Sequence, residues 1–281
     1  MEKTNRVPDT ENDFMQYKKL ATAVRIHCMR MTNKGRSGHL GSMLSMADIL
    51  AVLYEKILNV DPADPKWEER DRFILSKGHG GAAVYAVLAE KGFFPTEDLG
   101  TLRKIDSYLQ GHPDMKKVPG VEMSTGSLGT GFSTAIGMAL ASKLDKKENY
   151  IYALLGDGET QEGQIWEAAM AGAHYKLNNL IAFLDYNGLQ IDGDISKVMS
   201  PEPLPEKWKA FGWNVIEIDG HDFEAIEKAV AQAKENKDKP AMIIAKTIKG
   251  KGVSYMENEA GWHGKCPSPE EMEAALCELE Y

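Results

Sequence analysis

Cysteine is scarce in this sequence. The 281 residues include three cysteines, Cys28, Cys266 and Cys277, and no CxxC pair. An odd number without paired spacing argues against a disulfide framework or a zinc site, and we expect a cytoplasmic protein. No apolar run approaches the roughly 18 residues of a membrane-spanning helix. The polar, charged N-terminus (MEKTNRVPDTEND) is unlike a signal peptide.

Positive charge is also in deficit. The formal net charge of −9 argues against a general nucleic-acid-binding protein, although it does not exclude a local anion site. Two common nucleotide-binding signatures are missing, GxGxxG after a strand and GxxxxGK[ST]. The length predicts one large domain over residues 1–281, with 1–12 as a flexible tail.

Alternating strand and helix patterns run through most of the chain. We predict helices at 14–31, 45–58, 81–90, 99–109, 126–144, 162–175 and 223–236, and strands at 72–76, 150–155, 180–185, 213–218 and 241–247. This order predicts an α/β fold with a doubly wound, mostly parallel sheet and helices on both faces. Ligands of such sheets bind at the carboxyl ends of the strands.

Two predicted strands end in polar residues. Asp157 follows one strand and Asn187 follows the next, one strand–helix–strand unit later. Each motif alone is typical of an ordinary turn. If the strands are neighbours, however, both side chains enter one crevice, and their oxygens suit Mg²⁺ or Ca²⁺. Gly156 and Gly158 would let the backbone approach a phosphate, and the helix near Glu162 would present its N-terminus to an anion.

Several stretches together resemble the transketolase family of thiamine-diphosphate enzymes. They are GDGETQEGQIWEA at 156–168, DYNGLQIDG at 185–193, and the segments at 37–39, 46–48, 75–80, 111–113, 125–129, 219–222 and 246–250. They occur in the family's order between about residues 20 and 275. The resemblance implies the diphosphate-binding domain, with thiamine diphosphate and Mg²⁺ (or Ca²⁺ or Mn²⁺) as cofactors.

The resemblance also implies roles for individual residues. The metal ligands would be Asp157, Asn187 and the backbone carbonyl of Leu189. The other expected cofactor contacts are His79, Gly126, Ser127, Leu128, Gly156, Gly158, Glu159, Glu162, Lys246 and His263. Among these, Glu162 matches the position that reaches the partner subunit's catalytic glutamate.

Histidines next to glycines supply the expected catalytic groups. By resemblance, His39 and His263 would bind substrate oxygens and move protons, and His112 would bind the sugar near its first hydroxyl. A surface turn is the alternative for any one of these histidines, and an ordinary strand end is the alternative for Lys246. We expect His221 to belong to a loop that caps a helix.

The resemblance covers only part of a full transketolase. We therefore expect Met1 and the acidic tail SPEEMEAALCELEY to mark the natural ends of one subunit. A separate C-terminal subunit would carry the catalytic glutamate, and the two kinds of chain would form an α₂β₂ assembly. The expected reaction transfers a two-carbon ketol unit between small phosphorylated sugars.

Two other functions fit part of this pattern. One is a different thiamine-diphosphate enzyme, such as the first component of a 2-oxo-acid dehydrogenase or a 1-deoxyxylulose-5-phosphate synthase. The other is a non-catalytic scaffold, because a fold does not dictate its function. Donor assays with ketoses and 2-oxo acids distinguish the enzymes, and loss of metal or histidine positions would favour the scaffold.

Overall fold

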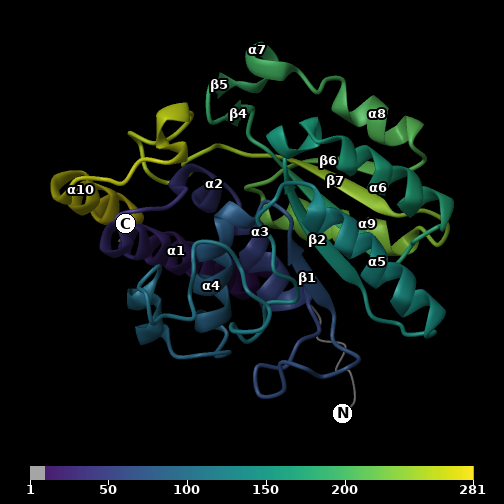
Figure 1. The fold of residues 1–281 in the computed structure, drawn as a ribbon, viewed down its shortest axis with the longest axis horizontal. Coiled ribbons are helices and arrows are strands. Elements are labelled where there is room, and N and C mark those ends of the chain that lie inside the picture. The colour runs from purple at the N-terminus through teal and green to yellow at the C-terminus, as the bar shows by residue number, and fades with distance from the viewer. Residues whose placement is uncertain (1–9, 281) are drawn as a thin grey trace.

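A computed structural model describes residues 10–280. Five parallel strands form the central sheet in the order β1-β2-β3-β7-β6 (Figure 1). The strands are β1 (Arg72–Leu75), β2 (Ile151–Gly156), β3 (Leu180–Tyr186), β6 (Asn214–Asp219) and β7 (Ala241–Lys246). The predicted doubly wound α/β fold is confirmed.

Helices cover both faces of this sheet. The hydrophobic core on one face includes residues of α1 (Thr10–Gly35), α2 (Leu40–Ser45), α3 (Ala47–Val52), α4 (Gly81–Glu90), α9 (Phe223–Glu235) and α10 (Pro269–Glu280), with α10 packed on α1. The other face packs against α5 (Thr130–Leu144), α6 (Gly163–His174) and α8 (Leu204–Ala210). Successive strand residues alternate between the two cores, as in Phe183 and Leu184, because side chains along a strand point to opposite faces.

A small hairpin follows β3 at the carboxyl edge of the sheet. Its antiparallel strands are β4 (Leu189–Gln190) and β5 (Gly193–Asp194), and α7 (Ile195–Met199) comes next. Three short 3₁₀ turns lie in the loops near this edge: η2 (Gly78–Gly80), η4 (Gly158–Gln161) and η5 (Ala260–His263). The segments expected to bind ligand therefore come together at one edge.

Several predicted helices have different bounds in the structure. The predicted helix at 45–58 is observed as α3 followed by a π-helical turn, η1 (Leu53–Ile57), and the additional helix α2 ends just before it, at Met46 (φ −91°, ψ 0°). The predicted helix at 99–109 is wrong. It is reduced to a 3₁₀ turn, η3 (Thr96–Thr101), because Leu102 is extended and Arg103 is left-handed (φ 61°). Helix α5 begins at Thr130, since Gly129 has a φ of 84°.

The predicted tail at 1–12 lies mostly outside the described residues. Residues 1–9 are not described, and Thr10 begins the first turn of α1. Within residues 10–280, none of the helices combines the length and apolar character needed to cross a membrane.

Candidate active site

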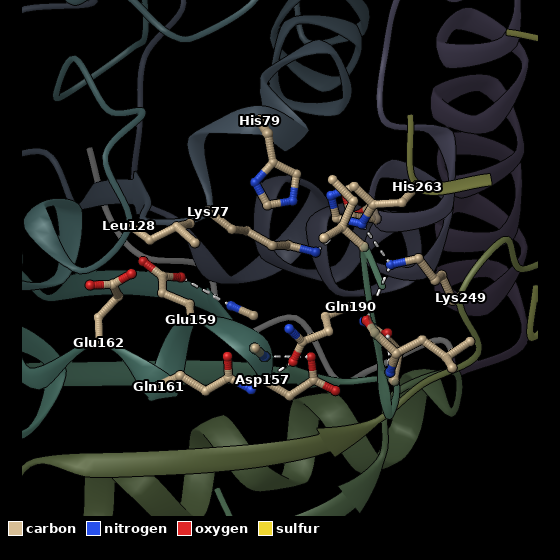
Figure 2. Close-up of a pocket in the computed structure, with 16 residues that line it drawn as sticks. Lys77, His79, Leu128, Asp157, Glu159, Gln161, Glu162, Gln190, Lys249 and His263 are labelled. Atoms are coloured by element: carbon tan, nitrogen blue, oxygen red, sulfur yellow. Dashed lines mark hydrogen bonds between the residues drawn. The ribbon is translucent and has the colours of Figure 1, made fainter. Parts of the chain in front are cut away.

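A cavity of about 280 Å³ opens at the carboxyl ends of β2 and β3. In Figure 2, Lys77 and His79 enter it from one side, and Asp157 and Gln161 from the opposite side. Ten of the predicted site residues line it: His79, Leu128, Gly156, Asp157, Gly158, Glu159, Glu162, Asn187, Leu189 and His263.

Strand register explains why Asp157 and Asn187 meet. β2 and β3 are parallel neighbours, with Gly156 opposite Asp185, and the Asp157 N–H donates to the Asp185 carbonyl at 3.3 Å. Asp157 and Asn187 therefore leave adjacent strands at the same edge. The expectation that one strand–helix–strand unit brings them into one crevice is confirmed by this pairing.

Asp157 is a buried carboxylate that forms no salt bridge within the described part of the chain. It is 2% exposed, and its two oxygens accept the N–H groups of Gly158 (2.8 Å) and Gly188 (2.6 Å). Burial, followed by the nearby Asp185 carboxylate, raises the pKa of Asp157 to about 6, and the two N–H donors oppose this rise. A cation would relieve this cost of burying negative charge.

The oxygen donors beside Asp157 fit a small hard cation. The Leu189 carbonyl accepts a hydrogen bond from the Lys249 ammonium at 3.2 Å and retains a second lone pair. The side-chain oxygen of Asn187 accepts the Leu189 N–H at 3.2 Å and retains a second lone pair. One carboxylate, one amide and one carbonyl make an all-oxygen set of the kind that Mg²⁺ or Ca²⁺ prefers. Among residues 10–280, no cluster of three or more His, Cys, Asp or Glu offers an alternative metal site.

Glu159 connects three loops around the cavity. Its carboxylate accepts the Gly129 N–H (2.8 Å), the Gly156 N–H (3.1 Å) and the Ser76 hydroxyl (2.5 Å). Burial raises the pKa of Glu159, and these donors act against the rise. Glu159 therefore holds the start of α5 against the ends of β1 and β2. Glu159 also lines the cavity, and its contact with a diphosphate stays a prediction.

A buried ion pair supports the cavity, and its lysine lines the wall. The Lys77 ammonium donates to the Asp185 carboxylate and to the Ser42 carbonyl (2.9 Å), and both charged side chains are at most 2% exposed. The hydroxyls of Ser45 (2.6 Å) and Thr247 also donate to Asp185. Burial raises the pKa of Asp185, but the Lys77 charge and these hydrogen bonds outweigh it and lower the pKa overall.

Three imidazoles meet at the cavity, and two of them, His79 and His263, line it. Ring centroids are 5.1 Å apart for His39 and His79, 5.3 Å for His39 and His263, and 5.3 Å for His79 and His263. Burial, followed by neighbouring positive charge, lowers the pKa of His79 to about 2 and that of His263 to about 3. The pKa of His39 is lowered for the same reasons. These imidazoles are neutral at pH 7.

This cluster predicts acid sensitivity of the unliganded chain. The unfolded chain protonates His79 below about pH 6.5, whereas the folded chain does so only near pH 2, so the free energy of unfolding falls as the pH drops. Between pH 7 and pH 5, His79 alone should cost about 2 kcal/mol. Urea denaturation of wild type and His79→Gln at both pH values measures the difference. An equal pH dependence in the two proteins would contradict the prediction.

The remaining predicted residues lie at different distances from the cavity. His112 packs against Gly126, since a Cβ atom added to Gly126 would lie 3.3 Å from the His112 ring. Ser127, the next residue of the Gly126 loop, is exposed and precedes Leu128. Lys246 does not line the cavity. It is exposed at the end of β7 and lines a separate, more open depression with His221.

Sequence reasoning missed two lysines of the cavity wall. Lys77 and Lys249 are both 1% exposed, and the Lys249 ammonium lies 3.1 Å from Nδ1 of His263 (Figure 2). Burial lowers the pKa of Lys249 to about 8, with the Asp157 charge acting in the opposite direction. The signal that could have found them is a lysine inside an otherwise apolar or glycine-rich motif. The structure also adds Ser42, Gln161, Gln190 and Ile191 to the wall.

The fold and the cavity together define an α/β domain that presents oxygen donors, buried lysines and neutral imidazoles at the carboxyl edge of a parallel sheet. Residues 16–279 match the family described as "Transketolase, thiamine diphosphate binding domain". The chain belongs to this family.

Two similar relatives have nearly the length of this chain. The 6-deoxy-6-sulfo-D-fructose transketolase subunit SqwG of Clostridium sp. (strain MSTE9) is 49% identical, over 92% of this chain and 94% of its own length. An apulose-4-phosphate transketolase subunit of Phocaeicola vulgatus is 46% identical, over 91% of this chain and 90% of its own length.

Solved transketolases are longer. The structure from Campylobacter jejuni superposes with a TM-score of 0.90 at 36% identity, over 95% of this chain and 43% of that one. For the Leishmania mexicana enzyme the TM-score is 0.89 at 35% identity, over 94% and 41%. This chain therefore spans about two fifths of the solved transketolases that it matches.

Proposed function

We propose that this chain is the N-terminal subunit of a two-chain transketolase, which moves a two-carbon ketol unit from a ketose to an aldose. The observation that carries the proposal is the pattern of coverage. The relatives that match over 90% or more of their own length are called transketolase subunits, whereas the solved transketolases continue well beyond the matched region.

Bound thiamine diphosphate would supply the electron sink for breaking the carbon–carbon bond beside the ketose carbonyl. In this chain, Asp157, Asn187 and the Leu189 carbonyl would hold Mg²⁺ (or Ca²⁺ or Mn²⁺), and the chemistry of these donors supports this part of the proposal. Lys77 and Lys249 place two ammonium groups in the cavity wall, which favours an anionic diphosphate.

The neutral histidines would bind the sugar. A neutral imidazole both donates and accepts a hydrogen bond, so His39, His112 and His263 can orient hydroxyl and carbonyl oxygens and hold a proton between them. His79, which lines the cavity itself, would face the cofactor. Partial burial of His39 and His263 limits the water that would compete for the same hydrogen bonds, whereas His112 is exposed.

A C-terminal transketolase subunit would complete the site with its catalytic glutamate. We propose an α₂β₂ assembly with the cofactor between the two kinds of subunit, and with Glu162 directed toward the partner. Glu162 lines the cavity and is exposed, as a residue that reaches a second chain should be. The relatives' names direct the substrate search toward sulfo-sugars and ketose phosphates.

The proposal predicts that the isolated chain has no ketol transferase activity. Because no residue of this chain is expected to replace the partner's glutamate, activity should appear only after mixing with the product of a neighbouring gene, thiamine diphosphate and Mg²⁺. The donors to assay are 6-deoxy-6-sulfo-D-fructose, a ketose phosphate and a 2-oxo acid. Ketol transfer by this chain alone would refute the two-chain proposal, and turnover of only the 2-oxo acid would refute the reaction.

A further inference from the structure

His221 uses both of its ring nitrogens within the protein. Nδ1 lies 2.7 Å from the Asp48 carboxylate, and Nε2 accepts the backbone N–H of Ile248 at 2.9 Å. A backbone N–H can only donate, so Nε2 must be unprotonated, and the neutral ring must carry its proton on Nδ1. The contacts therefore define the tautomer: Nδ1–H donates to Asp48, and Nε2 receives from Ile248.

The support behind His221 is rigid and buried. The Arg25 guanidinium donates two hydrogen bonds, of 2.9 and 2.6 Å, to the Asp48 carboxylate. Both side chains are less than 10% exposed. Burial raises the pKa of Asp48, but the Arg25 charge and the His221 hydrogen bond lower it by more. The pKa is therefore lowered overall, and Asp48 is ionised. A paired, ionised carboxylate is a strong acceptor that keeps the His221 ring in one orientation.

The loop that carries His221 packs closely against the end of β7. The Gly220 N–H donates to the Lys246 carbonyl at 2.8 Å. A Cβ atom on Gly220 would lie 2.5 Å from the Thr247 methyl, so only glycine permits this approach. The imidazole is thereby brought onto the Ile248 N–H from outside the active-site cavity.

Ile248 directly precedes Lys249, whose ammonium lies in the cavity. The segment is fixed on both sides, since the Thr247 hydroxyl donates to Asp185 and the Lys249 carbonyl accepts the Asn258 N–H at 2.9 Å. Between these anchors, the Ile248 carbonyl accepts the Lys251 N–H at 3.2 Å, and the Ile248 N–H donates to His221, the distant side chain that holds the backbone leading into Lys249. At the end of that path, the ammonium meets the Leu189 carbonyl and His263.

We propose that His221 is a positioning residue for the candidate active site. Through the relay Arg25–Asp48–His221–Ile248, helices α1 and α3 hold the Lys249 loop so that the Lys249 ammonium stays on the Leu189 carbonyl. His221 lines its own depression with Lys246, but both of its nitrogens are occupied, so it is not a free ligand group there. A contribution of Lys249 to cofactor binding rests on the proposed function, whereas its placement by His221 does not.

The test compares two lysines of the same segment in the full-length chain. Acetic anhydride labelling, read by mass spectrometry, reports the accessibility of buried Lys249, and exposed Lys246 is the internal control. In His221→Leu, Lys249 should be labelled roughly five- to tenfold faster than in wild type, the change expected for the loss of one buried hydrogen bond. Lys246 labelling should not change. His221→Gln should restore protection, because its amide offers one donor and one acceptor like the imidazole.

Amide hydrogen exchange separates positioning from a general loss of stability. Support for the proposal is faster exchange confined to residues 247–250 in His221→Leu, with the rest of the chain unchanged. Unchanged Lys249 protection, or faster exchange spread over the whole chain, would overturn it. His221→Phe serves as a second apolar variant. If neither apolar variant folds, His221 acts on global stability and the proposal is also refuted. None of these readouts needs ketol transfer, so they remain decisive if the proposed reaction is wrong.

Discussion

Replacing Lys77 with methionine should lower the free energy of unfolding of the unliganded chain by about 3–5 kcal/mol. The substitution leaves the Asp185 carboxylate, which is 0% exposed, without its cationic partner. The Ser45 and Thr247 hydroxyls still donate to Asp185, but neutral donors do not replace a charge in a buried site. Urea denaturation followed by circular dichroism measures the change.

Two further variants identify the cause of this loss. Asp185→Asn combined with Lys77→Met removes both charges, and it should recover a large part of the stability because no unpaired ion remains. Lys228→Met breaks the exposed helical pair with Glu224 and should cost less than about 1 kcal/mol. If Lys77→Met is as stable as Lys228→Met, the buried pair does not support the cavity.

Replacing Asp157 with asparagine should strongly weaken metal-dependent cofactor binding with little loss of stability. Loss of a charged ligand should weaken Mg²⁺-dependent binding of thiamine diphosphate by at least on the order of 100-fold, because substitution of mere supporting residues already costs 10–100-fold. Asp157→Asn retains an oxygen for the Gly158 or Gly188 N–H and removes a negative charge whose burial is unfavourable. The stability of the unliganded chain should therefore change little.

Calorimetric titration of the two-chain complex with thiamine diphosphate and Mg²⁺ measures this effect. Asp192→Ala is the matched control, since it removes an exposed carboxylate from the same hairpin region without touching the cavity. Binding by Asp157→Asn that is as tight and as metal-dependent as in Asp192→Ala would show that Asp157 is not a metal ligand.

The sequence predicted the parts of the site that depend on strand ends. Asp157 and Asn187 could be placed together because parallel neighbouring strands finish at the same edge. The pairing of Gly156 with Asp185 then confirms that the strands are neighbours. Local patterns also identified the helices on both faces, because their apolar positions repeat with a helical period.

Local patterns failed where backbone geometry or distant contacts decide. The region after η3 contains enough apolar residues to suggest a helix at 99–109, but extended Leu102 and left-handed Arg103 end it. The resemblance assigned a cofactor contact to Lys246, with an ordinary strand end as the alternative, and gave no role to Lys249. The Lys246 side chain is exposed, whereas the turn after β7 carries Lys249 back into the cavity.

The sequence by itself determined the order of the strands, the edge of the sheet at which the candidate site lies and the oxygen donors that follow β2 and β3. These follow from local periodicity and from the direction of parallel strands, which are properties of short segments. Only the tertiary structure decided that Lys77 pairs with Asp185, that three imidazoles meet as neutral rings, and that His221 holds the Lys249 loop. Such pairings join residues far apart in the chain, 108 positions for Lys77 and Asp185, and they depend on burial, which no local pattern specifies.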